Sequence, residues 1–214
     1  MESDARMRKP IITAARLRSS FKTLRAPLGL ALVIVVLMLL GDDAREVLAY
    51  DRSALERGEL WRALSCSFVH LGEYHAALNL LGLLALVVLC PQAASAREWL
   101  RRLFWLSLGT SLGLYLFVPA LQGYVGFSGV LHGLFFLGLW PLARRGDLIA
   151  VGCLLYLLGK LVWEIVVGAP LSDEVAIGGP VVTQAHLFGT LAALAYAGMV
   201  SAFGSIWGRG EIKQ

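Results

Sequence analysis

The sequence predicts an all-α, polytopic membrane protein whose helices cross the bilayer six times. Of the 214 residues, 57% are hydrophobic and 16% are charged, whereas about a quarter of the residues in a soluble domain are charged. The mean hydropathy is +0.69, and several charge-free runs approach the length of about 20 residues that a spanning helix needs. Together these observations favour a membrane protein over a soluble domain.

The expected spans follow from the apolar runs, taken in chain order. The first run is short, and its helix can begin before Arg25; a signal peptide is the alternative, but no small-residue cleavage site follows Leu40. The long run from 103 to 143 contains Pro119 and Gly123, which divide it into two helices. Gly178-Gly179-Pro180 delays the start of the last helix. The expected spans are therefore 26–41, 74–96, 103–118, 127–143, 148–172 and 182–208.

Basic residues set the expected orientation. The segments before span one, between spans two and three, between spans four and five, and after span six all carry lysine or arginine, and all fall on one side. Because basic loops stay in the cytoplasm, both termini are expected there, with the acidic loop 42–73 outside. The pI near 9.1 then reflects topology, and we expect no nucleic-acid partner. The expected domains are a basic tail at 1–25, a membrane domain at 26–208 and a short tail at 209–214.

The cysteines do not indicate a disulfide framework or a metal site. Cys66, Cys90 and Cys153 are odd in number and widely spaced. Their expected role is that of small core residues. We therefore expect neither a metal nor a cofactor.

Five polar side chains are expected at one depth in the membrane. Spans two, four and six run in the same direction, so their N-terminal ends meet at the outer face. Polar groups in a bilayer are costly and indicate a specific role. The five are His75 and Asn79 in span two, Ser128 and His132 in span four, and His186 in span six.

Ser128 and His186 have the features of a nucleophile and its base. Gly126 and Gly129 flank the hydroxyl at a helix start, where glycine permits a tight turn and close approach and free N–H groups favour an oxyanion. A serine needs a base to become a nucleophile, and His186 can serve if spans four and six touch. Small residues allow that contact: Gly129 and Gly133 on one helix, and Ala185, Gly189 and Ala193 on the other.

Each of these features also has a simpler interpretation. A single GxSG in an apolar helix more often serves packing, and His75 with Asn79 can simply hold helices together. Lys160 and Glu164 in span five can form an internal ion pair or reach the interface; our hypothesis is that Glu164 faces the side from which substrate enters. For the whole chain, the alternatives are a non-catalytic membrane protein that binds clients and a bis-histidine haem protein.

Three motifs, in order and at matching spacing, resemble those of the rhomboid intramembrane proteases: HxxxxHxxxN, GxSG and AHxxG. A Trp-Arg pair upstream is similar to the pair in the first loop of that family. The resemblance covers residues 27–200 and implies a six-helix rhomboid-like bundle. The matching residues are His70, His75 and Asn79; Gly126, Ser128 and Gly129; Ala185, His186 and Gly189; and Trp61 with Arg62.

The resemblance implies a role for each motif residue. Ser128 is the nucleophile and His186 the general base of a dyad, since the family has no third acidic member. The oxyanion hole consists of His75, Asn79 and the backbone N–H of Ser128. The remaining roles are supporting ones: His70 is structural or organises water, and Trp61 and Arg62 anchor the first loop at the membrane interface.

One departure resembles a subfamily. Typical rhomboids have a tyrosine four residues after the serine, whereas this chain has His132; the string GxSGxLHG is similar to the rhombosortases, as is the stretch from Tyr50 to Arg62. That resemblance implies membrane-anchored substrates with a C-terminal Gly-Gly motif, a transmembrane helix and a basic tail, cleaved by hydrolysis or by transfer to an amine. It implies the inner membrane of a bacterium, with the site facing the periplasm. It leaves open whether His132 stacks on His186 or hydrogen-bonds to it.

Overall fold

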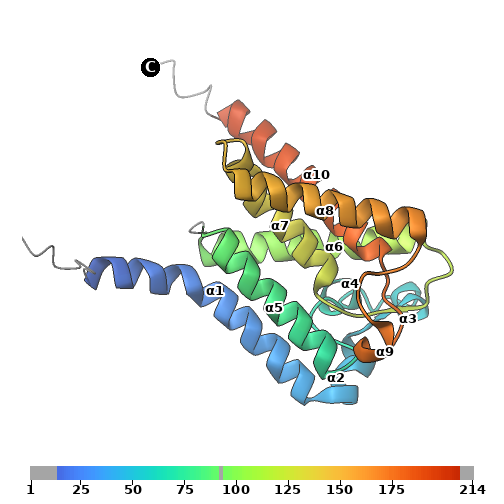
Figure 1. The fold of residues 1–214 in the computed structure, drawn as a ribbon. Coiled ribbons are helices and arrows are strands. Elements are labelled where there is room, and N and C mark those ends of the chain that lie inside the picture. The colour runs from blue at the N-terminus through green and yellow to red at the C-terminus, as the bar shows by residue number, and fades with distance from the viewer. Residues whose placement is uncertain (1–13, 92–93, 208–214) are drawn as a thin grey trace, which may run out of the picture.

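In the part of the chain that the structure describes, six long helices form the body (Figure 1). The computed structural model describes residues 14–91 and 94–207, with side chains for 24–91 and 94–202. This part of the chain is mostly helical, as predicted. The long helices are α1 (Ala14–Leu39), α5 (Glu73–Leu89), α6 (Ala96–Phe117), α7 (Ser128–Ala143), α8 (Leu148–Val167) and α10 (Gln184–Trp207).

The loops contain short elements that the sequence did not predict. The first loop forms three short helices, and a fourth precedes α10. Two strands of two residues pair antiparallel, with Tyr50 opposite Tyr124, so the first loop is tied to the loop before α7. The short elements are α2 (Gly41–Leu48), α3 (Arg52–Glu56), α4 (Arg62–Ser65), α9 (Glu174–Ile177), β1 (Tyr50–Asp51) and β2 (Gly123–Tyr124).

Much of the two predicted tails lies outside the described residues. These parts are residues 1–13 of the N-terminal tail and the C-terminal stretch 208–214. α1 begins at Ala14, so the first long helix extends back past Arg25, as the sequence allowed. The division into tails and membrane domain therefore remains a prediction.

Several predicted helix ends differ from the observed ones, and α5 ends at Leu89 rather than 96. α6 begins at Ala96 rather than 103, because the Ser95 hydroxyl accepts a hydrogen bond from the Glu98 N–H at 3.1 Å. Glu98 also pairs with Arg101 and, at 2.8 Å, with Arg102, so charges expected in a turn lie on the helix instead. α8 ends at Val167 rather than 172, since Gly168 adopts a left-handed conformation that stops the helix.

Length and composition alone identify fewer than six spans among the described helices. α8 and the part of α10 from Gln184 to Ala202 are long and apolar enough to cross a membrane singly. α1 and α2 form a third candidate if the pair, bent by 108°, counts as one span. α5 and α7 are apolar but have 17 and 16 residues, below the usual length of about 20. The count of six remains a prediction.

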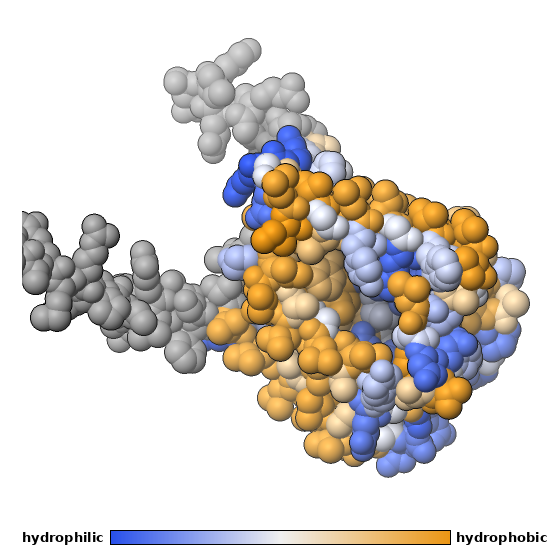
Figure 2. Space-filling view, viewed as in Figure 1, coloured by the Kyte–Doolittle hydropathy of each residue, from blue (hydrophilic) through white to orange (hydrophobic). Residues whose placement is uncertain are grey.

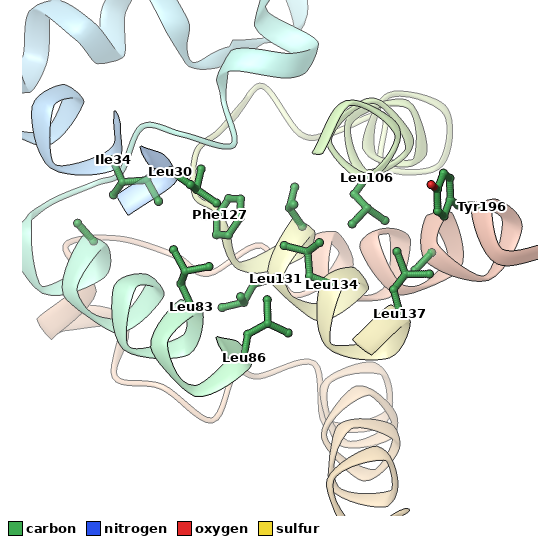
Figure 3. Packing of buried hydrophobic residues seen from close by; sticks show 13 residues of the cluster. Leu30, Ile34, Leu83, Leu86, Leu106, Phe127, Leu131, Leu134, Leu137 and Tyr196 are labelled. Atoms are coloured by element: carbon green, nitrogen blue, oxygen red, sulfur yellow. The ribbon is translucent and has the colours of Figure 1, made fainter. Parts of the chain in front are cut away.

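α7 lies at the centre of the helix bundle. It packs against α5, α6, α8 and α10, and its buried residues lie on all sides of the helix. A helix that is apolar all round is stable only when other helices cover it. Figure 3 shows its core, in which side chains of α1, α5, α6 and α10 surround Phe127, Leu131, Leu134 and Leu137.

Glycines bring the backbones of α7 and α10 into close contact. A Cβ on Gly189 would lie 1.9 Å from the Gly129 carbonyl oxygen, and one on Gly133 would lie 2.6 Å from the Gly189 carbonyl oxygen. Larger residues would force the helices apart. The contact predicted from the small residues is confirmed, and it places the start of α7 beside the first turn of α10.

Apolar side chains cover much of one face of the molecule. Figure 2 shows a largely orange face, with hydrophilic side chains gathered on the side of α2, α3 and α9 and around a hollow. Large hydrophobic residues are exposed along several long helices, for example Leu32, Leu84, Phe117 and Val166. Continuous exposed apolar surface of this kind marks contact with lipid or with a partner.

Candidate active site

Ser128 and His186 are in hydrogen-bond contact at the start of two adjacent helices. Ser128 is the first residue of α7, and His186 lies in the first turn of α10. The Ser128 Oγ is 3.0 Å from His186 Nε2, and His186 is 4% exposed. A hydroxyl and an imidazole at this distance can exchange a proton.

A cleft of ≈ 680 Å³ reaches Ser128. Its walls include His75, Tyr124, Arg45 and Val181. The N-terminal ends of α5, α7 and α10 lie on the side of the molecule that carries α3 and α9 (Figure 1). The three helix starts therefore share one end of the bundle, as the order of the apolar runs predicted.

Gly126 and His75 fit against each other at the edge of this cleft. Gly126 has φ +124°, and a Cβ there would lie 2.8 Å from His75 Nε2. The Leu71 N–H donates to His75 Nδ1 at 3.4 Å, so the ring hydrogen is on Nε2, where the imidazole can donate. The Tyr124 hydroxyl donates to the Gly126 carbonyl at 2.8 Å and holds this loop in place.

Asn79 is buried one turn beyond His75 on α5. It is 4% exposed, and its Nδ2 donates to the His75 carbonyl at 2.9 Å. One hydrogen of the amide is therefore used within its own helix. Of the two side chains expected in the oxyanion hole, His75 lines the cleft, while Asn79 contacts the backbone behind it.

His70 supports the ring of His75. The two imidazoles meet edge to face, with centroids 5.0 Å apart. Both His70 nitrogens lack a hydrogen-bond partner among the described residues, and burial lowers its pKa to about 3. His70 is therefore a neutral, buried ring in the loop before α5.

His132 stacks on the imidazole of His186. Its ring centroid is 4.2 Å from that of His186, and the rings are inclined by 12°. Its Nδ1 is 2.7 Å from the Ser128 carbonyl oxygen, one turn back in α7, and its Nε2 is 3.2 Å from Lys160 Nζ. Of the two arrangements left open by the sequence, the structure has the stacked one.

Glu164 is buried against His186, and its position relative to the side from which substrate enters stays a prediction. It is 3% exposed, and its Oε2 is 2.8 Å from His186 Nδ1. Its Oε1 is 2.5 Å from Lys160 Nζ, so the alternative interpretation as an internal ion pair is observed. The reason is the rotation of α8, which turns this face toward α10. The Glu164 carboxylate thus contacts His186, which in turn contacts Ser128.

Trp61 and Arg62 hold the first loop in shape by donating hydrogen bonds to backbone carbonyls of the same loop. Arg62 donates to the carbonyls of Glu46 and Ala49 at 2.8 and 3.0 Å and pairs with Glu59 at 2.7 Å. Trp61 is 51% exposed, and its indole donates to the Val47 carbonyl at 3.2 Å.

Two arginines near the site were not singled out from the sequence. Arg45 lines the cleft and donates to the Leu71 carbonyl. Arg52 donates to the carbonyls of Tyr115, Val118 and Leu121, each at 3.0 Å, at the end of α6. Neither has a sequence signal, because a loop arginine looks the same whether it is solvated or caps a distant helix.

The described residues include no group of three His, Cys, Asp or Glu side chains placed to hold one metal ion. The thiols of Cys66, Cys90 and Cys153 are free, and Cys66 is buried.

The fold and this site define a class: an integral membrane protein in which a serine hydroxyl beside a cleft contacts a buried imidazole. Residues 57–203 match the family described as the Rhomboid domain, and the chain belongs to the rhomboid family. No curated protein matches the chain. Rhomboids are generally intramembrane serine proteases that act on membrane-protein substrates, although some members are inactive. The family predicted from the motifs is confirmed, whereas the subfamily is not distinguished.

Proposed function

We propose that this chain is an active intramembrane serine endopeptidase with Ser128 as nucleophile and His186 as general base. The observation that carries the proposal is the 3.0 Å contact between Ser128 Oγ and His186 Nε2, reached by the cleft. An inactive relative has no need of an aligned hydroxyl and imidazole.

The reaction has two halves. The Ser128 hydroxyl attacks the carbonyl carbon of the scissile peptide and passes its proton to His186 Nε2. The C–N bond then breaks, and the departing amine takes that proton, which leaves an acyl ester on Ser128. Water, or a second amine, gives its proton to His186 and attacks the ester, and Ser128 recovers its hydrogen as the product leaves.

The oxyanion of each tetrahedral intermediate needs donors aimed at it. The His75 Nε2–H is oriented for this by the Leu71 N–H on the other nitrogen. The Ser128 N–H, at the start of α7, is a second donor and lies at the positive end of the helix dipole. The third donor is the N–H of the Asn79 side-chain amide that does not contact the His75 carbonyl. Gly126, without a side chain, leaves room for the His75 ring.

The substrates we propose are membrane-anchored proteins with a C-terminal Gly-Gly motif, an apolar span and a basic tail. Support comes from His132, which occupies the position of the usual tyrosine, as in the rhombosortase-like motif; in this structure it stacks on His186. Small residues before the span suit a cleft in which the substrate backbone must approach Ser128 closely. The product is either a free carboxylate or an amide made with an amine.

We further propose six spans, with both termini in the cytoplasm and the cleft open to the periplasm of a bacterial cell. Of the basic segments predicted to be cytoplasmic, the two that the structure describes in full, at 97–102 and 144–145, lie at the end opposite the helix starts that carry Ser128 and His186. Peptide bonds at the outer edge of the membrane are then the accessible ones.

A reporter protein ending in Gly-Gly, an apolar span and a basic cluster tests this function. Co-expression with the wild-type chain should release a shortened reporter, and mass spectrometry of its new C-terminus separates hydrolysis from transfer to an amine. Ser128→Ala and His186→Ala should each abolish the product while leaving the protein folded. Retained cleavage in either variant would refute the assignment, and reporter binding without cleavage by the wild type would favour a non-catalytic client-binding protein.

A further inference from the structure

Behind the proposed dyad, three further side chains form a connected polar group within the helices. Glu164 and Lys160 belong to α8 and His132 to α7, and all three reach toward His186 on α10. The side chains of Glu164 and Lys160 are 2% and 17% exposed. Buried charges in a membrane protein need a compensating partner and indicate function.

We propose that Glu164 is a positioning residue, itself held in place by Lys160. Its carboxylate orients the His186 ring and stabilises the imidazolium that forms during catalysis, so that the site works as a Ser–His–Glu triad. This rests on the proposed function of Ser128 and His186. It departs from the dyad that the family resemblance implies.

The first reason is the position of the imidazole hydrogen. His186 Nε2 can accept the Ser128 proton only if the ring hydrogen is on Nδ1. Glu164 Oε2, at 2.8 Å from Nδ1, accepts that hydrogen. Lys160 Nζ is also close to Nδ1, at 3.2 Å, and an ammonium would favour the opposite, unproductive tautomer. The carboxylate is nearer, and it selects the productive one.

The second reason is that Lys160 already has other acceptors. Its ammonium donates to Glu164 Oε1 at 2.5 Å. His132 donates from Nδ1 to the Ser128 carbonyl, which leaves His132 Nε2 as an acceptor for Lys160 at 3.2 Å. Lys160 therefore fixes the carboxylate on one side and the stacked imidazole on the other, and both flank His186.

The third reason is charge during the reaction. When His186 takes the Ser128 proton, an imidazolium forms 3.2 Å from the Lys160 ammonium. Two cations at this distance repel strongly where water is scarce. Glu164 contacts both and carries the balancing charge. Without it, Lys160 opposes proton transfer, so removing the carboxylate alone should be worse than removing both charges together.

The test compares Glu164→Gln, Lys160→Met and the double variant with the wild type, using two readouts. One is kcat and KM for the Gly-Gly reporter; the other is the rate at which a fluorophosphonate forms an Oγ–P bond on Ser128, with loss of fluoride and of the hydroxyl proton. Glu164→Gln should lower kcat and the labelling rate about 10²-fold or more with KM changed less than about twofold. The double variant should recover at least about tenfold over Glu164→Gln.

Glu98→Gln is the matched control, because Glu98 also forms i+3 and i+4 ion pairs but on α6, outside the cleft. It should lower the thermal midpoint in detergent without changing kcat. If Glu164→Gln aggregates, the test is the comparison of the double variant with the wild type. Equal kcat in the double variant and the wild type then overturns the inference.

The inference would also be overturned if folded Glu164→Gln had the same kcat and labelling rate as the wild type. A double variant no faster than Glu164→Gln would overturn it as well. Failure of the proposed function looks different: the wild type itself is then unlabelled, or Ser128→Ala is labelled equally.

Discussion

At the residue scale, Gly126 is the position where the cleft tolerates no side chain. Its φ of +124° disfavours any other residue, and a Cβ would meet the His75 ring. Gly126→Ala should therefore lower kcat by about 10²-fold, the usual effect of losing one oxyanion donor. Reporter cleavage by the purified variant measures this.

Gly146→Ala is the control for the backbone effect. Gly146 also has a positive φ, +86°, but open space around its Cα. This variant should lose stability and keep its kcat. Equal losses of activity in the two variants would show that strain, and not the fit to His75, explains the effect of Gly126→Ala.

The sequence predicted the contact between Ser128 and His186 but not the contact between Glu164 and His186, for a physical reason. Ser128 and His186 stand in short motifs at helix starts, so chain order alone brings them to one end of the bundle. The role of Glu164 depends on how α8 is rotated about its own axis, and the spacing of Lys160 and Glu164 shows only that they share a face. That face could turn to lipid, to the cleft or to α10.

At the element scale, the contact between α7 and α10 holds the two site residues together. Gly189→Ala would place a Cβ 1.9 Å from the Gly129 carbonyl oxygen, so the helices must separate. Overpacking of this kind costs about 1–3 kcal/mol, and the variant should lower both the thermal midpoint and reporter cleavage.

Gly198→Ala, on the same helix but in open space, is the control for that variant. It should be neutral or stabilising by up to about 1 kcal/mol, because alanine is the better helix former. A Gly189→Ala variant with the stability and activity of Gly198→Ala would contradict the close contact.

The end of α6 depends on Arg52 in the first loop. Its guanidinium donates to the Tyr115 carbonyl in the last turn of the helix and to the Val118 carbonyl that follows it, and it lies 4.7 Å from the Tyr115 ring centroid. Arg52→Met should cost about 1–3 kcal/mol, the penalty for buried acceptors left unpaired. Thermal unfolding in detergent checks this, with Arg57→Met, whose side chain is 63% exposed, as a control expected to change little.

Helix ends were the less predictable part of the elements. Hydropathy placed the start of α6 after its arginines, whereas Ser95 and the Glu98 pairs extend the helix through them. The strands β1 and β2 have no sequence pattern, since their pairing depends on the first loop folding back to the loop before α7. The apolar centres of the helices were predictable, because composition alone determines them.

At the scale of the whole molecule, composition predicted an integral membrane protein of helices, and the rhomboid match over residues 57–203 agrees. The arrangement around α7 could be anticipated only in part. Small residues indicated the contact with α10, but the packing of four helices on one apolar helix requires the three-dimensional structure. The polar groups of the site lie among these packed helices, and a cleft reaches Ser128.

Mapping a fluorophosphonate adduct on the folded, full-length wild-type protein is the most direct measurement of the central claim. An activated hydroxyl beside an imidazole should react, and mass spectrometry should find the adduct on Ser128, with labelling lost in His186→Ala. A wild-type protein that stays unmodified, or an adduct on another serine that persists in His186→Ala, would contradict the account.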